Sequence, residues 1–532
     1  MTLIATQDLR PNSLSASENL QVYCGLDCCL TIEIFEELAT TYGSPPAIYS
    51  FERALQGPYL EIMQRGFKVD ELARRRAAES LHERIGHLRQ MLDEFAIAVW
   101  DKPLNPRSPQ QLRSFFYSVM KLPEVWINQK GERKLSTNRE ALEKLEQYLY
   151  AKPFISLILA IRDLSKQLEV FETEIDSDGR FRTSYNIAGT ETGRPSSSEN
   201  AYGTGGNAQN IAPSLRYVFV ADPGYKLAVI DLEQVEARDV GFFCGCLFDD
   251  WTFLDSCESG DLHSNNAKLI WPELPWTGEA KADRKIAERN FYRDFSYRDM
   301  AKRGSHLSNY SGTAWTAARS LKVPIAIMDE FQARYIRGRP EVLDLKTGAR
   351  LPAIAAAFPC IPRYWQWIAQ QLQTTHILVT PFGRRRHFFG RPGDDTTLRE
   401  AIAFMPQSTT ADRMNLGLWR VWHFMPGRVE LLAQTYDSIT FQYPSDKDED
   451  SIISEALERI KVELVAPNGR RYVVPGEAKI GWNWGAQVTS QDVAKALAEG
   501  KKAPRLNPDG LAKWSGSKPD LRIRQTGLQR GM

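Results

Sequence analysis

The sequence predicts an α+β fold of several domains, and three observations support this prediction. The 532 residues exceed the usual size of one domain. Apolar residues recur at helical spacing through most of 50–170 and 250–345. Short β-prone runs lead to Asp231 and surround Asp437. Helices, mixed strands, helices and a final β-hairpin, in this order, are typical of an α+β protein.

Composition allows a large core but says little about partners. Apolar residues make up 42% of the chain, and 67 Lys and Arg nearly balance 66 Asp and Glu. A nucleic-acid partner must therefore be sought in local basic patches. No segment has the roughly 18 consecutive apolar residues of a membrane helix, and the N-terminus lacks the pattern of a secretory signal. We expect a cytoplasmic protein with no membrane partner, whose seven cysteines are reduced and mostly buried.

The first third of the chain is predicted to be helical. Residues 17–38 have apolar positions at helical spacing. The pattern resumes at residue 51, and Gly66 inside it marks a helix end or a kink. Ser108 followed by Pro109 suits the N-cap and first turn of a further helix.

From residue 175 onward, strand and loop signals become frequent. The stretch "IDSDGRFRTSYNIAG" predicts a hairpin with Asp178 and Gly179 at its turn. Residues 190–212 are rich in Gly, Ser and Asn and longer than an ordinary connection, so we expect them to carry function. Lys and Arg outnumber acids after residue 485, which predicts a basic, flexible tail.

Two acidic residues, Asp231 and Asp437, stand at the ends or breaks of predicted strands. Brought together, the two carboxylates would hold divalent metal, since Mg²⁺ prefers a few carboxylates plus substrate phosphates. Two such ions, about 3.5–4 Å apart, are the usual device for in-line displacement at phosphorus. Acids at strand ends are common, so this signal alone is weak.

Arg298, Lys302, His306 and Tyr310 recur every four residues. On a helix they share one face. The two cations suit the phosphates of a nucleoside triphosphate, and the aromatic end suits its base. A solvated cationic helix face is the alternative.

Taken together, these motifs resemble those of the family A DNA polymerases, in the divergent form of phage replication enzymes. "DLEQVEAR" from Asp231 resembles motif A, "RDMAKRGSHLSNY" from Arg298 motif B, and "QTYDSITF" from Gln434 motif C. The Gly/Ser/Asn-rich segment is similar to the family's primer–template segment, and "REAIAFMPQSTTAD" from Arg399 to its template-contacting helix. The resemblance runs from about residue 20 to 485 in the family's order.

The resemblance implies a right-hand polymerase fold with an antiparallel palm sheet, a helical thumb and helical fingers. The implied segments are 1–50, a remnant of an exonuclease domain; 51–185, the thumb with connecting helices; 186–250, palm with motif A; 251–388, fingers with motif B; 389–484, palm with motif C; and 485–532, the basic flexible tail.

The implied activity is template-directed DNA synthesis from a primer and dNTPs, for phage genome replication in the cytoplasm of a bacterial host. Asp231 and Asp437, with the backbone carbonyl of Leu232, are implied to hold two Mg²⁺ ions, with Mn²⁺ as an alternative. Lys302 joins the two aspartates as a catalytic residue.

The resemblance also implies binding residues. Arg298 and Lys302 would hold the phosphates of the nucleotide, His306 would contact its sugar and Tyr310 would pack on the new base pair. Glu236 would exclude a 2′-hydroxyl. The residues implied to contact DNA are Arg194, Gln209, Asn210, Arg399, Gln407 and Tyr436. The run Arg384, Arg385 and Arg386 is either a phosphate contact or a solvated charge run.

The chain departs from the family pattern at several positions. Ser438 stands where motif C usually has Glu, which puts metal preference and rate in doubt. Tyr436 replaces a usual His. His306 replaces a Phe or Tyr, which puts discrimination against 3′-deoxy analogues in doubt.

One exonuclease motif is recognisable, "YCGLD" ending in Asp27. Little chain precedes it, so we expect no intrinsic proofreading. We also expect a separate exonuclease or processivity chain to dock on residues 1–50. An ordinary helix acid is the alternative for Asp27.

Two other functions compete with DNA synthesis. A single-subunit RNA polymerase would share the fold, but Glu236 and the primer–template segment argue against it. A DNA-binding subunit with a dead site has no reason to keep Asp231 and Asp437 together with Arg298, Lys302 and Tyr310.

Overall fold

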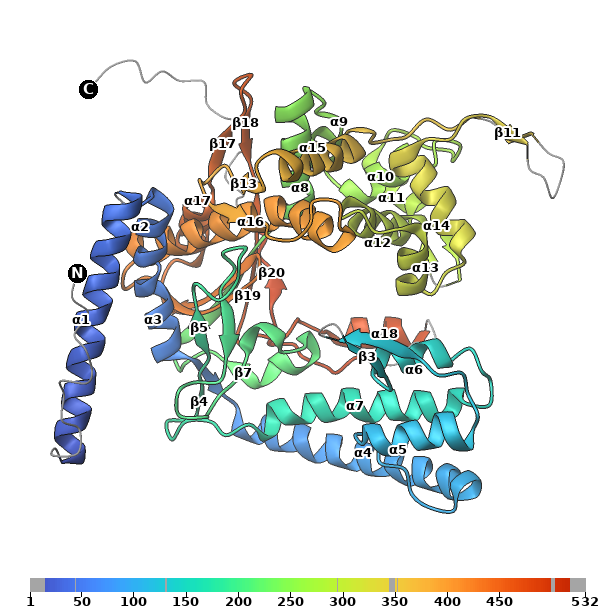
Figure 1. Cartoon of the computed structure of the whole chain (residues 1–532), viewed down its shortest axis with the longest axis horizontal. Coiled ribbons are helices and arrows are strands. Elements are labelled where there is room, and N and C mark those ends of the chain that lie inside the picture. The colour runs from blue at the N-terminus through green and yellow to red at the C-terminus, as the bar shows by residue number, and fades with distance from the viewer. Residues whose placement is uncertain are drawn as a thin grey trace. The chain divides into compact units, whose positions relative to one another are not determined.

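The computed structural model describes residues 15–43, 45–129, 132–293, 295–343, 350–351, 353–498 and 503–516 (Figure 1). The chain divides into two units, one up to Leu55 and one from Gln56 onward. No helix in the described part combines the length and the apolar character that crossing a bilayer requires.

The first unit consists of α1 (Ala16–Tyr42) and α2 (Ala47–Ala54). Ser15 and Glu18 form a capping box at the start of α1, which confirms the helix predicted over 17–38. Large apolar side chains of α1 are exposed, among them Leu20 (63%) and Ile34 (59%). A helix that is apolar on all sides is ordinarily covered by other protein.

The cysteines do not all follow the prediction of buried thiols. Cys24, Cys28 and Cys29 on α1 are exposed. The prediction was wrong for these three because helical spacing alone does not show whether a partner surface covers an apolar helix.

The second unit begins with a helical section. Its elements are α3 (Gln56–Arg65), β1 (Phe67–Val69), α4 (Glu71–Trp100), α5 (Pro109–Arg113), β2 (Trp126–Gln129), β3 (Glu132–Leu135), α6 (Arg139–Leu145) and α7 (Lys152–Glu172). Gly66, with φ +63°, follows the end of α3 as predicted. Ser108 caps α5, with Pro109 in its first turn.

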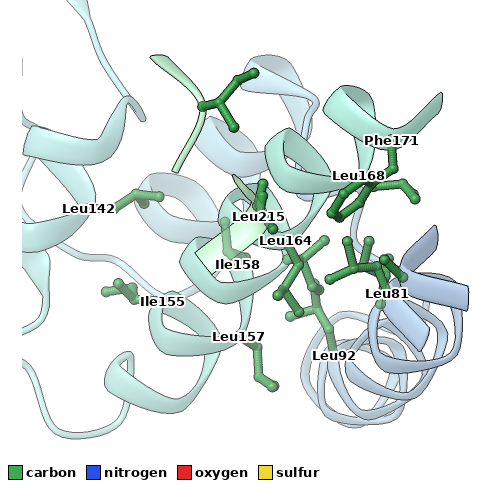
Figure 2. Packing of buried hydrophobic residues seen from close by; sticks show 14 of the residues in the cluster. Leu81, Leu92, Leu142, Ile155, Leu157, Ile158, Leu164, Leu168, Phe171 and Leu215 are labelled. Atoms are coloured by element: carbon green, nitrogen blue, oxygen red, sulfur yellow. The ribbon is translucent and has the colours of Figure 1, made fainter. Parts of the chain in front are cut away.

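The long helices α4 and α7 pack side by side and form the core of this section (Figures 1 and 2). Leu81 and Leu92 of α4 meet Leu164, Leu168 and Phe171 of α7 (Figure 2). Asp70 caps α4 by accepting a hydrogen bond from the backbone N–H of Ala73 (2.9 Å).

A five-stranded antiparallel sheet positions the site. Its spatial order is β15-β16-β8-β19-β20. The strands are β8 (Tyr225–Leu232), β15 (Glu430–Thr435), β16 (Ser438–Pro444), β19 (Gly476–Gly481) and β20 (Ala512–Lys513). The central strand β8 is therefore paired on both sides, by β16 and β19.

Helices and short ribbons connect these strands. Between β8 and β15 lie α8 (Val235–Phe248), α9 (Thr252–Glu258), α10 (Leu262–Ile270), α11 (Ala280–Ala287), β9 (Asn290–Tyr292), β10 (Phe295–Ser296), α12 (Tyr297–Asn309), α13 (Ala314–Leu321), α14 (Ile325–Gln332), β11 (Val342–Leu343), β12 (Arg350–Leu351), α15 (Cys360–Thr374), β13 (Ile377–Val379), β14 (Arg385–His387) and α16 (Asp395–Phe424). After β16 come α17 (Glu449–Ile460), β17 (Glu463–Val465), β18 (Arg471–Val473) and α18 (Ser490–Ala498).

A fully buried ion pair joins α16 to α8. Arg413 donates to Asp239 at 2.9 Å, and both side chains are 0% exposed. Thr410 and Tyr472 also donate to the Asp239 carboxylate, at 3.0 and 2.9 Å. Burial still raises the pKa of Asp239, against the opposing effect of Arg413. Without Arg413, the charged form of Asp239 would strongly destabilise the folded protein.

The hairpin predicted around Asp178 and Gly179 is wrong. The turn exists, since the Gly179 N–H donates to the Asp176 carbonyl (2.8 Å). However, β4 (Arg180–Phe181) pairs with β1, and β5 (Ser184–Asn186) pairs with β6 (Ser196–Ser198). A local turn signal does not reveal that a strand segment far away in sequence competes for pairing.

The tail predicted to be flexible after residue 485 is also corrected in part. Residues 503–516 are described, and β20 within them extends the sheet along β19. The indole of Trp514 donates to Asp450 at 2.8 Å. Composition rich in Pro, Gly and Lys thus concealed a short strand held by tertiary contacts.

Candidate active site

The sheet register brings Asp231 and Asp437 together. Ser438, the first residue of β16, lies opposite Asp231 on β8. Asp437 precedes it in the turn after β15, where Tyr436 adopts φ +56°. The Leu232 N–H donates to the Asp437 carbonyl at 3.0 Å. Two residues far apart in sequence are thereby fixed side by side at one end of the sheet.

Burial and neighbouring acids disfavour the charged forms of both carboxylates. Burial raises the pKa of Asp231, and the neighbouring charge of Asp437 raises it further. Burial likewise raises the pKa of Asp437, and Glu236 adds to this effect. Such a pair is stabilised by a cation, and hard carboxylate oxygens suit Mg²⁺. In the described part of the chain, no three His, Cys, Asp or Glu side chains gather as a metal cluster, so water and substrate would have to complete the coordination.

The residues predicted to share a helix face do so. A capping box between Ser296 and Asp299 fixes the start of α12. Along this helix, Arg298 is half-buried, while Lys302 and His306 are exposed. Tyr310, at the C-cap, holds its ring edge-on to His306, with centroids 5.5 Å apart.

The two cations of α12 have different surroundings. Arg298 donates from Nε and Nη2 to both oxygens of Asp261, each at 2.9 Å. Lys302 forms no ion pair with any described residue. Asp261, which precedes α10, was not predicted to belong to the site.

Glu236 is held from two sides near the start of α8. The Tyr310 hydroxyl donates to one carboxylate oxygen, and the Arg194 guanidinium donates to the other. Burial raises the pKa of Tyr310 well above its usual value, and the Glu236 charge adds to this effect, so Tyr310 stays a donor. Arg194 thus contacts Glu236, although the sequence placed it among the residues that contact DNA.

A pocket of about 300 Å³ joins these groups. Of the predicted site residues, it is lined by Glu236, Lys302, His306, Tyr310 and Asp437. Its wall also contains polar residues that the sequence analysis missed, namely Gln234, His263, Asn266, Ser305 and Asn309.

Several buried polar atoms of this wall have no hydrogen-bond partner in the part of the chain that the structure describes. These are His263 Nδ1, Asn266 Nδ2, Ser305 Oγ and Gln234 Oε1. Burial lowers the pKa of His263 to about 4, and the charges of Arg298 and Lys302 contribute. His263 and Asn266 are three positions apart and share one face of α10, so this pair of polar side chains was the available signal.

Four of the six predicted DNA contacts gather beside the β15–β16 turn. The Tyr436 hydroxyl donates to Asn210 (3.3 Å), and the Arg194 guanidinium lies 5.9 Å from the Tyr436 ring. The Gln209 amide donates to Gln434 Oε1 at 3.3 Å. The other two predicted contacts lie on α16 and do not line the pocket: Arg399 pairs with Asp395 (3.4 Å), and Gln407 is half-buried.

The arginine run before α16 is mostly used internally. Arg384 is buried and donates to Asp412 at 2.7 Å. Arg386 pairs with Glu191 and Glu400. Only Arg385 of the three is exposed without a partner among the described residues.

A sequence model described as DNA polymerase family A matches residues 75–486, more than half of the chain. The chain belongs to DNA polymerase family A. This membership agrees with the family resemblance of the motifs around Asp231, Arg298 and Asp437.

Relatives and a solved structure give the same picture. DNA polymerase I of Chloroflexus aurantiacus is 24% identical over 497 residues, 88% of this chain and 46% of that protein. The thermostable DNA polymerase I of Thermus filiformis is 27% identical over 399 residues, 71% of this chain and 41% of that protein. The chain thus spans less than half the length of these relatives.

The solved structure is the POL domain of Pol1 from M. smegmatis in complex with DNA primer-template and dNTP. It is 21% identical, with a TM-score of 0.61, and the likeness covers 81% of this chain and 69% of that one. At this identity the likeness shows the fold. The predicted α+β polymerase fold is confirmed at that level.

Proposed function

We propose that the chain is a DNA-directed DNA polymerase that extends the 3′-hydroxyl of a primer with dNTPs on a DNA template. The observation that supports this best is the placement of Asp231 beside Asp437 at a pocket that also contains Lys302 and Tyr310. Membership of DNA polymerase family A supports the same reaction.

Asp231 and Asp437 are proposed to hold two Mg²⁺ ions, with Mn²⁺ as an alternative, and the Leu232 carbonyl completes the protein ligands. Two neighbouring, half-buried carboxylates that form no larger metal-binding cluster with other described residues fit ions that take their other ligands from water and phosphate. The chemistry that bound Mg²⁺ supplies is activation of the primer hydroxyl and neutralisation of the leaving pyrophosphate.

The α12 face is proposed to bind the nucleotide. Lys302, which forms no ion pair with a described residue, would meet phosphate oxygens, and it is counted with the two aspartates as catalytic. Arg298 would join it after releasing Asp261. His306 would contact the sugar, and Tyr310 would pack against the new base pair.

Glu236 is proposed to exclude the 2′-hydroxyl of a ribonucleotide. Its carboxylate lines the pocket, and its two partners, Tyr310 and Arg194, restrict its rotamers. A carboxylate held in this way cannot swing aside to make room for an extra hydroxyl. DNA would lie along Arg194, Gln209, Asn210 and Tyr436, with Arg399 and Gln407 farther along the template.

Primer extension tests this function. On a primed single strand with Mg²⁺, the wild type should extend with dNTPs and not with rNTPs, and Asp437→Ala should abolish extension. Asp446→Ala, an exposed acid just after β16 (side chain 77% exposed), is the matched control and should keep full activity. Tight duplex binding without extension by the wild type would contradict the proposal.

A protein partner on residues 1–50 is proposed as well, because α1 exposes several large apolar side chains. The proposed occupant is a separate exonuclease chain. Size-exclusion chromatography of the pair, with and without residues 1–50, tests it, and unchanged co-elution after the deletion would contradict it. The phage origin, the cytoplasmic location and the lack of intrinsic proofreading stay predictions from the sequence.

A further inference from the structure

The ribbon of β13 and β14 presents an unusual outer face. Along β14 and its extension, Arg385, His387, Phe389 and Arg391 are all exposed. The intervening Phe388 is buried against Phe404, with ring centroids 5.9 Å apart. From Arg385 to Phe389 this alternation is that of an extended strand, in which every second side chain faces the same way. Arg391 follows after a bend at Gly390. We call these four exposed residues the outer ribbon face.

Two aromatic rings occupy the middle of the outer ribbon face. The Phe389 side chain is 97% exposed. The His387 ring is nearly parallel to it, with 17° between the planes and 6.4 Å between the centroids. A fully exposed phenyl ring gains nothing from folding, because its apolar surface stays in water.

The cations at the two ends of this face are not neutralised by the protein. Arg385 and Arg391 form no ion pair with any described residue. The nearby acids are engaged elsewhere: Glu191 and Glu400 pair with Arg386, and Asp395 pairs with Arg399. Asp394 accepts hydrogen bonds from the first turn of α16. Positive charge therefore remains at both ends of the stacked rings.

The ribbon is connected to the proposed DNA contacts. It leads directly into α16, which carries Arg399 and Gln407. At its other end, the Arg384 guanidinium packs against Gly193, the residue before Arg194. The outer ribbon face is thus connected to the proposed DNA contacts in two ways, by the chain that continues into α16 and by the packing of Arg384 against Gly193.

We propose that the outer ribbon face binds single-stranded DNA, and that this strand is the unpaired template ahead of the primer. A base stacks on the Phe389 and His387 rings, and Arg385 and Arg391 contact the flanking phosphates. Aromatic rings between cations are the usual platform for single strands, because every base offers a π-face and every linkage a charge. The identification of the strand as template rests on the proposed function.

The test compares two primer–templates by fluorescence anisotropy. One has a 5′ template overhang of roughly 15 nucleotides, long enough for a typical single-strand site, and the other has an overhang of about one nucleotide. Phe389→Ala should weaken binding of the long overhang by about tenfold and leave the short one unchanged, and Phe389→Trp should restore binding. Arg385→Ala should weaken binding of the long overhang less than Phe389→Ala does. It should also reduce the salt dependence of the binding constant by about one released counterion.

Controls separate this site from general electrostatics and from catalysis. Lys447→Ala removes another exposed cation, located after β16 (side chain 65% exposed), and should have no effect. Equal affinity of the wild type and Phe389→Ala for the long overhang would overturn the inference. An equal loss on both overhangs, or the same loss in Lys447→Ala, would overturn it too. Primer extension is measured on the same samples. If the primer is not extended, this result counts against the proposed polymerase function alone, whereas the binding measurements test the outer ribbon face.

Discussion

The contact between Arg298 and Asp261 leads to a quantitative prediction about nucleotide affinity. Arg298 is proposed to bind phosphate, yet both of its hydrogen bonds to Asp261 are 2.9 Å long. Incoming phosphate must therefore displace a carboxylate that already occupies the guanidinium. Asp261→Asn keeps the shape of the side chain and removes the competing charge.

The expected gain in dNTP affinity follows from the strength of the ion pair between Arg298 and Asp261. Hydrogen bonds to charged groups contribute about 1.5–3 kcal/mol. Both side chains are about a quarter exposed (25% and 26%), so solvent screens part of this value. After this discount we use about 1.4 kcal/mol, just below the range, which corresponds to roughly tenfold tighter dNTP binding.

Single-nucleotide extension at varied dNTP concentration measures this change as a lower KM. The control is the same substitution in an Arg298→Ala background, where no competition remains and the gain should vanish. If Asp261→Asn weakens dNTP binding, or has the same effect in both backgrounds, Asp261 does not compete with phosphate and the reasoning fails.

Three further predictions concern other parts of the second unit. Glu236→Ala should raise incorporation of rNTPs relative to dNTPs by at least about tenfold (1.4 kcal/mol); an unchanged ratio in single-nucleotide extension would contradict the proposed gate. Arg413→Met should lower the free energy of unfolding by about 3–5 kcal/mol in urea titrations, because it leaves Asp239 buried and unpaired. Burial raises the pKa of Asp239 in the folded state, so its charged form lowers stability above the unfolded pKa of about 4. The stability lost in Arg413→Met should therefore shrink as the pH falls. A stability loss that does not depend on pH, or a double variant Arg413→Met/Asp239→Asn that is no more stable than Arg413→Met, would argue against this account. Gly193→Ala should lower the midpoint of thermal unfolding, because φ is +76° there and a Cβ would meet the Arg384 guanidinium; an unchanged midpoint would contradict both the backbone strain and the steric contact.

Sequence reasoning succeeded where the signal is local. The four-residue spacing from Arg298 to Tyr310 is a property of one helix, and α12 shows it directly. The β-prone runs around Asp231 and Asp437 likewise became β8, β15 and β16. The fold class followed from the order of such local elements.

The rest depends on pairings between distant segments. Arg384 binds Asp412 of α16 instead of facing DNA, and the spacing of residues in the sequence does not reveal this contact. The ion pair between Arg298 and Asp261 likewise joins segments that are distant in the sequence. His263 and Asn266 were missed because their importance appears only when α10 packs near Lys302.

The pairing of β8 also governs when activity can arise during synthesis. Its partners β16 and β19 begin only at Ser438 and Gly476, far along the chain. Until the ribosome has produced those strands, β8 carries Asp231 on an unpaired, apolar edge that is prone to aggregation. Loop closure over such a distance is slow. A nascent or prematurely terminated chain that stops before Asp437 therefore cannot assemble the acidic pair on which the proposed activity depends.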